Sequence, residues 1–219
     1  MKRMVERLSA MSLSLCFMVT FATLGSAQEG RSTRDGKPIT AAEALRRYEE
    51  RLQTSSEPLQ IFYLTTKAAA TALAAGEITK ARAYAQDLLQ QAAAHQENWN
   101  HGNAIQVGNL VLGLIALKAD NVPEAKRLLL EAGKSRGSPQ LNSFGPNFRL
   151  AKELLARGER EVVIEYFDLC AEFWKRDKDK DRLEDWKALV NGGRIPNCGA
   201  NLNYQLDTWR FEDWTKLQP

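Results

Sequence analysis

The chain has 219 residues, which is enough for one or two domains with a buried core. Hydrophobic residues make up 44% of it and charged residues 26%, a composition that excludes a disordered protein and is typical of a globular one. The formal net charge of +3 is too small for a nucleic-acid-binding protein, whose basic residues gather on one face, so we expect no nucleic-acid partner.

Residues 1–27 have the pattern of a secretory signal peptide. Three basic residues stand among the first seven, residues 8–24 carry no charge, and small residues at 25–27 precede an expected cut before Gln28. The uncharged stretch is shorter than the roughly 20 apolar residues that a membrane-spanning helix needs, which favours cleavage over an uncleaved anchor. We therefore expect export to the bacterial periplasm or the cell exterior, and no stable membrane insertion of the cleaved chain.

A polar, glycine-containing lead-in, residues 28–38, precedes the first predicted helix. Thr40 and Glu43 form a capping-box pattern, in which the Thr40 hydroxyl accepts from the Glu43 amide and the Glu43 side chain reaches back. The helix that follows is strongly charged and has a narrow apolar stripe, which is typical of a helix at the end of a stack. We expect a helical domain over residues 39–192.

Three helical hairpins are predicted inside this domain, at about residues 57–97, 103–133 and 146–174. Two helices that are joined by so tight a turn must pack antiparallel. One hairpin cannot bury its own apolar faces, so the three hairpins should stack on one another. The segment between the second and third hairpins is rich in Gly, Ser and Pro, which predicts a loop.

The chain after the third hairpin is more polar. Residues 175–182 alternate in the sign of their charge and predict a solvated turn, and residues 183–190 predict a short last helix. Three large aromatic residues lie in the irregular tail, residues 193–219: Trp209, Phe211 and Trp214. Because such side chains would promote aggregation if they were exposed, we expect the tail to pack on the domain, either over the hairpin stack or on the last hairpin alone.

The hairpins share a pattern when they are aligned on their turns at Gly76, Asp120 and Gly158. The turns are 44 and 38 residues apart. The matching positions lie seven residues before and five residues after each turn, and they hold Ala69 and Ala81, Gly113 and Ala125, and Ala151 and Val163. This pattern resembles the tetratricopeptide repeat, although that family has a period of 34 residues. The resemblance implies an all-α fold of stacked antiparallel hairpins, an α-solenoid.

The same resemblance implies a concave groove, which the first helices of successive hairpins line. The positions that it assigns to the groove are Tyr63, Thr66, Leu110, Leu114, Lys118, Phe148 and Lys152. A largely apolar floor with two lysines suits an extended peptide or an amphipathic helix of some acidic character. The alternative is that these residues belong to the core and are covered by flanking segments of this chain.

A second resemblance covers residues 144–174 and 193–204, which look like a segment of uncharacterised exported bacterial helical-repeat proteins. It implies export but no reaction. Together, the two resemblances predict an exported, non-enzymatic helical-repeat module that mediates protein–protein interaction or scaffolds an envelope assembly, with an unknown protein or peptide as its partner.

Reactive groups that would converge in an enzyme are sparse. The sequence contains no HExxH, GxSxG or phosphate-binding loop, so we assign no catalytic residue, metal site or cofactor. The alternative function uses the two histidines, His95 and His101, which could share a metal with Glu97 or Asp120 in an enzyme or metal-dependent protein. The simpler interpretation is that both histidines are exposed loop residues.

Two cysteines, Cys170 and Cys198, follow the signal segment. An oxidising compartment and an even number favour a disulfide between them. Cys170 also falls on the inner face of a predicted helix, where a free thiol packs like a small apolar residue. The sequence leaves both states open.

Overall fold

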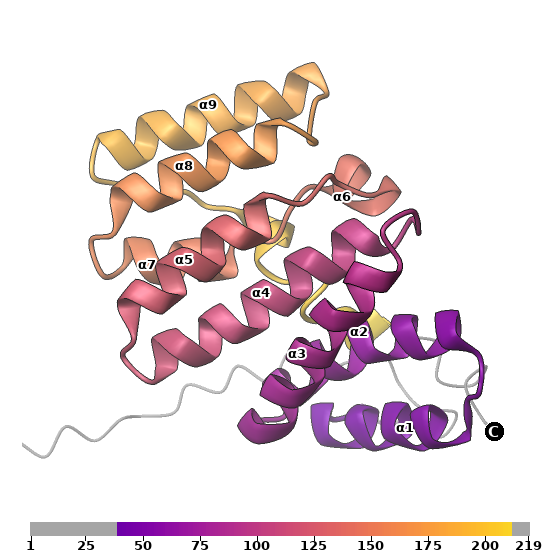
Figure 1. The fold of residues 1–219 in the computed structure, drawn as a ribbon. Helices are drawn as coiled ribbons and strands as arrows, with labels where there is room; N and C mark the ends of the chain where they lie inside the picture. Colours follow the sequence, from indigo (N-terminus) through magenta and orange to yellow (C-terminus); the bar gives the residue numbers. More distant parts are fainter. Residues whose placement is uncertain (1–38, 212–219) are drawn as a thin grey trace, which may run out of the picture.

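The computed structural model describes residues 39–211, and the regular elements in this range are all helical (Figure 1). The nine α-helices of the described range are Ala41–Thr54 (α1), Pro58–Ala74 (α2), Ile78–Ala94 (α3), His101–Lys118 (α4), Val122–Gly133 (α5), Pro139–Phe144 (α6), Arg149–Leu155 (α7), Arg160–Ala171 (α8) and Asp177–Asn191 (α9). Two 3₁₀ turns follow, Gly199–Leu202 (η1) and Thr208–Phe211 (η2). The all-α prediction is confirmed for this range.

Consecutive helices pack on one another along the chain (Figure 1). Helices α1 to α4 are antiparallel neighbours, α5 packs on α4, and α8 packs on α5 and α9. One buried cluster joins α1–α4 with the tail residues Leu206 and Trp209, and a second joins α4, α5 and α7–α9 with Cys198. The tail therefore contributes to the core at both ends of the stack.

The three predicted hairpin turns have one geometry. Gly76, Asp120 and Gly158 each have a positive φ, of 79°, 58° and 85°. The amide of the residue after each one donates to a carbonyl five residues back, as in Glu77 to Ala72 at 2.9 Å. These bonds form a Schellman motif, which satisfies the last carbonyls of the first helix and reverses the chain. The second helix then begins two residues after the positive-φ residue.

The small residues of the sequence alignment lie where the two helices of each hairpin meet. All six aligned positions are buried: Ala69, Ala81, Gly113, Ala125, Ala151 and Val163. A Cβ atom added to Gly113 would lie 2.3 Å from Leu150 Cδ2 and 3.4 Å from Leu128 Cβ, so α4 approaches its neighbours as closely as glycine allows.

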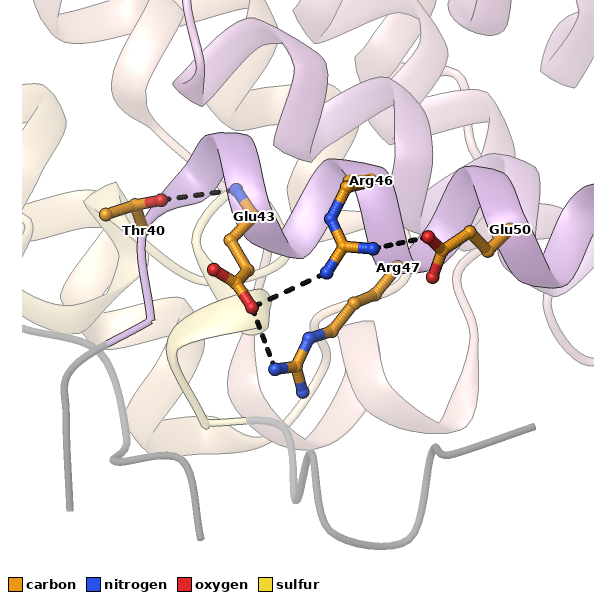
Figure 2. Close-up of polar contacts among 5 residues, drawn as sticks. All are labelled: Thr40, Glu43, Arg46, Arg47 and Glu50. Atoms are coloured by element: carbon orange, nitrogen blue, oxygen red, sulfur yellow. Dashed lines mark hydrogen bonds and ion pairs between the residues drawn. The ribbon is translucent and has the colours of Figure 1, made fainter. Parts of the chain in front are cut away.

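Helix α1 starts at the predicted cap, but only half of the capping box forms (Figure 2). The Thr40 hydroxyl accepts from the Glu43 amide at 3.2 Å. The Glu43 carboxylate instead accepts from Arg47 Nη2 at 2.9 Å and lies 3.7 Å from Arg46 Nη2 (Figure 2). A carboxylate one turn before two arginines gains more from these charge-assisted contacts than from a single backbone amide.

Two predicted irregular segments are in fact partly helical. The charged run at residues 175–182 is not a solvated turn, because α9 begins at Asp177 and runs through it. Acidic side chains at the start of a helix complement its dipole, and the Asp179 carboxylate is buried beside the Arg176 guanidinium. The predicted loop before Pro146 contains α6, whose N-cap Ser138 accepts from the Leu141 amide at 2.9 Å.

Some predictions fall outside the described residues. These are the signal segment at 1–27, the lead-in at 28–38 and Trp214, and the side chain of Phe211 is likewise not described. Between residues 39 and 211, none of the helices is long and apolar enough to cross a membrane.

Candidate functional site: the helix face under the C-terminal tail

Helix α4 carries buried amide side chains in its otherwise apolar first half. Asn103 and Gln106 are separated by three residues, so they lie on one side of the helix, and their exposed fractions are 7% and 0%. A buried amide that finds no hydrogen-bond partner destabilises the folded state, so this side of α4 requires polar neighbours. The neighbours come from the segment before α7 and from the C-terminal tail.

Asn103 joins four segments of the chain. Its Oδ1 accepts from Ser138 Oγ at 2.6 Å and from Gln205 Nε2 at 2.7 Å. Its Nδ2 donates to Asn100 Oδ1 at 3.0 Å and to Gln140 Oε1 at 3.3 Å. The side chain of one residue on α4 thus holds the loop before α4, the start of α6 and the tail.

Asn147, just before α7, binds the main chain of the tail. Its Nδ2 donates to the carbonyls of Leu202 at 3.1 Å and Tyr204 at 2.6 Å. Its own amide donates to Gln106 Oε1 at 3.1 Å, and its carbonyl accepts from Tyr166 Oη at 2.8 Å. Asn147 is fully buried, so these bonds are shielded from water.

A side-chain amide of the tail likewise binds the main chain of the segment before α7. The Asn201 carbonyl accepts from the Phe148 amide at 2.9 Å, and Asn201 Nδ2 donates to the carbonyls of Phe144 and Pro146, each at 2.9 Å. Farther along, Leu206 and Trp209 are 2% and 4% exposed, and η2 contacts α2. The tail runs from α9 behind α5 and α4 to α2, as the yellow segment of Figure 1 shows.

The predicted groove residues are divided by this arrangement. Leu110 and Phe148 are fully buried, whereas Tyr63, Thr66 and Leu114 are partly exposed and Lys118 and Lys152 are exposed. The burial of Leu110 and Phe148 agrees with the alternative interpretation, in which the groove residues belong to the core and other segments of this chain cover them. Binding of a partner by the others stays a prediction.

Two of the predicted groove residues, Tyr63 and Thr66, have hydrogen-bond partners within the chain. Asn98 Nδ2 donates to Tyr63 Oη at 3.0 Å, and Asn100 Nδ2 donates to Thr66 Oγ1 at 3.2 Å. Both contacts tie α2 to the loop before α4.

The two cysteines are buried free thiols in the same apolar cluster. Burial raises the pKa of Cys170 far above the usual thiol value and raises that of Cys198 to about 11, although the nearby Lys152 charge acts in the opposite direction. Both are therefore protonated at neutral pH and are poor nucleophiles.

The residues of the alternative metal site, His95 and His101 with Glu97 or Asp120, do not converge on one point. His95 stacks on Phe62 with ring centroids 5.0 Å apart, and burial together with the Arg136 charge lowers the pKa of His101. Asp120 follows the opposite end of α4, roughly 27 Å from His101 along a helix that rises 1.5 Å per residue. Within the described range there is no group of three His, Cys, Asp or Glu side chains that could hold a metal ion.

Sequence reasoning missed the amide network altogether. The signal was present, because Asn103, Gln106 and Asn109 recur every three residues in a helix that is otherwise apolar. The tail is also rich in amides, with Asn197, Asn201, Asn203 and Gln205. Pairing these two sets would have suggested that they meet.

No protein-family model matches the chain, and no curated protein or solved structure matches it.

Proposed function

We propose that this chain is an exported, non-enzymatic helical-repeat module, similar to tetratricopeptide proteins, that binds a peptide segment of a protein partner. The face formed by α4 and the segment before α7 is the binding surface in this proposal. The tail occupies that face in the isolated chain, and it provides a view of how a segment of turns and 3₁₀ helix fits there.

The observation that carries the proposal is the contact between Asn147 and the tail main chain. One side-chain amide donates to two carbonyls, those of Leu202 and Tyr204, that are two residues apart. Such bonds recognise a backbone in a given conformation and do not depend on the side chains of the bound segment. A face with this chemistry suits segments of varied sequence.

The repeated hairpin geometry supports the solenoid part of the proposal. Three turns with the same positive-φ position, each flanked by buried residues at the aligned positions, are what stacked copies of one unit require. Side chains on one face of the first helices then line a common surface.

A labelled peptide with the sequence of residues 199–211 tests binding directly. In the wild-type protein the attached tail competes at a high effective concentration, so we expect weak binding. Trp209→Ala removes a buried anchor of the tail, and this variant should bind the peptide more tightly in a fluorescence-anisotropy titration. Adding Asn147→Ala should abolish that gain, and a peptide that fails to bind Trp209→Ala would refute the proposal.

Export is a separate part of the proposal, and it rests on the pattern of residues 1–27. Intact-mass measurement of the protein from the periplasm or culture medium should give a chain that begins at or near Gln28. A chain that keeps Met1 and is found with the membrane would contradict it.

A further inference from the structure

A polar hollow of about 270 Å³ remains open between α7 and the tail. Arg149, Lys152 and Glu153 of α7 line one side of it, and Asn203, Asp207 and Arg210 of the tail line the other. Three cations thus face two carboxylates across a gap between segments that are distant in sequence. The hollow carries an excess of positive charge.

The three cations are not neutralised equally. Arg149 Nη1 lies 4.0 Å from Asp207 Oδ2, at the outer limit for an ion pair, and the Asp207 side chain is only 10% exposed. Lys152 and Arg210 make no ion pair with any residue in the range 39–211. An ammonium and a guanidinium therefore lie beside the hollow with donors to spare.

The position of Arg210 is fixed by the core. Its guanidinium lies over the Trp209 ring, 4.5 Å from the centroid, and Trp209 is 4% exposed. A cation that stacks on a buried ring loses less conformational freedom when it binds a ligand than a free surface side chain does. Lys152 is on a helix, so the two cations are presented from ordered segments.

We propose that this hollow binds an oxyanion group, a carboxylate or a phosphate, through Arg149, Lys152 and Arg210. Guanidinium and ammonium groups form charge-assisted hydrogen bonds with such oxygens, and these bonds are stronger than neutral ones. The volume equals the share of roughly nine water molecules in the liquid, so the oxyanion enters with water or is carried by a larger molecule. The hollow exists while the tail lies on the binding face, because Leu202, whose carbonyl accepts from Asn147, also lines it.

Isothermal titration calorimetry of the whole protein at low ionic strength tests the site with two probes. Inorganic phosphate represents a free anion, and a short acetylated peptide with two glutamates represents a carboxylate on a partner. We expect at least one probe to bind, and Lys152→Gln and Arg210→Gln each to weaken it by about tenfold, since each removes a charged hydrogen-bond donor. The probe that binds more tightly identifies the source of the oxyanion.

Lys134→Gln is the matched control, because Lys134 is an exposed lysine at the C-cap of α5 that pairs with Glu131. It should leave the affinity unchanged. Lys152 is itself exposed, so Lys152→Gln should melt like the wild type and its effect on binding is separable from unfolding. The proposal is overturned if neither probe binds the wild-type protein, or if Lys134→Gln weakens binding as much as Lys152→Gln.

Discussion

The side-chain amide of Asn147 donates to the carbonyl of Tyr204 at 2.6 Å, across 57 residues of sequence. The same amide also donates to the Leu202 carbonyl. The Asn147 backbone amide donates to Gln106, and its carbonyl accepts from Tyr166. One buried residue before a short helix thus links α4, α8 and the tail. Truncating its side chain should break the bonds to the tail and leave the backbone bonds to Gln106 and Tyr166 in place.

Asn147→Ala should lower the free energy of unfolding by about 1–3 kcal/mol, because two partly buried carbonyls lose their donor. Urea denaturation gives the change, and binding of an apolar dye should increase as the tail loosens. Asn191→Ala, at the exposed end of α9, is the control and should have little effect. Equal stability of the two variants would mean that Asn147 does not hold the tail.

Gly76→Ala and Gly158→Ala should each cost about 1–2 kcal/mol for a purely conformational reason. Both residues have positive φ, and an added Cβ would meet nothing within 4 Å at either site. Gly192→Ala provides the comparison, since its φ is −77° and the new Cβ makes only ordinary contacts. Thermal unfolding of the three variants separates backbone conformation from packing, and an unaffected Gly76→Ala would argue against the turn geometry.

Gly113→Leu and Ala125→Leu should each destabilise the fold by about 1–3 kcal/mol or more, because the helix crossing has no space for a larger side chain. Gly113 is already within 2.3 Å of Leu150 when only a Cβ is added, and Ala125 is fully buried. Ala188→Leu, on an exposed position of α9, is the control. Unchanged melting temperatures for both core variants would refute the hairpin alignment.

Stability should fall as the pH rises from about 9 to 12. Burial raises the pKa of Cys198 from 9.0 to about 11 and that of Tyr204 from 10.0 to about 12. The unfolded chain therefore loses these protons at a lower pH than the folded chain, and each group costs at most about 1.4 kcal/mol per pH unit between its two pKa values. Urea midpoints at pH 8 and pH 10 measure the fall, and below pH 9 the contribution is complete.

Cys198→Ala is the control for this titration. It removes one of the groups whose pKa is raised by burial, so its midpoint should decline less between pH 8 and pH 10 than that of the wild type. An identical decline would show that the Cys198 thiol is not protected by burial.

The hairpin turns could be predicted from sequence because their causes are local. Gly76 and Gly158 are glycines, which predicts a positive φ at the first and last turns. The apolar periodicity around Asp120 predicts the turn between them. The extent of α9 could not be read in the same way, since its first two turns are almost entirely charged. Its start depends on the contact between Arg176 and Asp179, which a pattern of alternating charge does not reveal.

The path of the tail depends on contacts that no local pattern contains. Gln205 meets Asn103 across 102 residues, and only the matching amide-rich composition of α4 and of the tail indicates the pairing. The burial of Phe148 has another cause, because its ring packs on Phe167 of α8 and Trp186 of α9. A prediction of open groove positions from repeat spacing therefore fails where helices of the next unit pack on those positions.

The tail also sets the order in which the molecule can be completed. Leu206 and Trp209 belong to the buried cluster of α1–α4, more than 85 residues after α4 ends. A chain that emerges from the ribosome or a translocation channel in the N-to-C direction has formed all nine helices before it can supply these side chains. The oldest part of the nascent chain therefore closes last, and its unfinished apolar surface is the one that a chaperone would meet first.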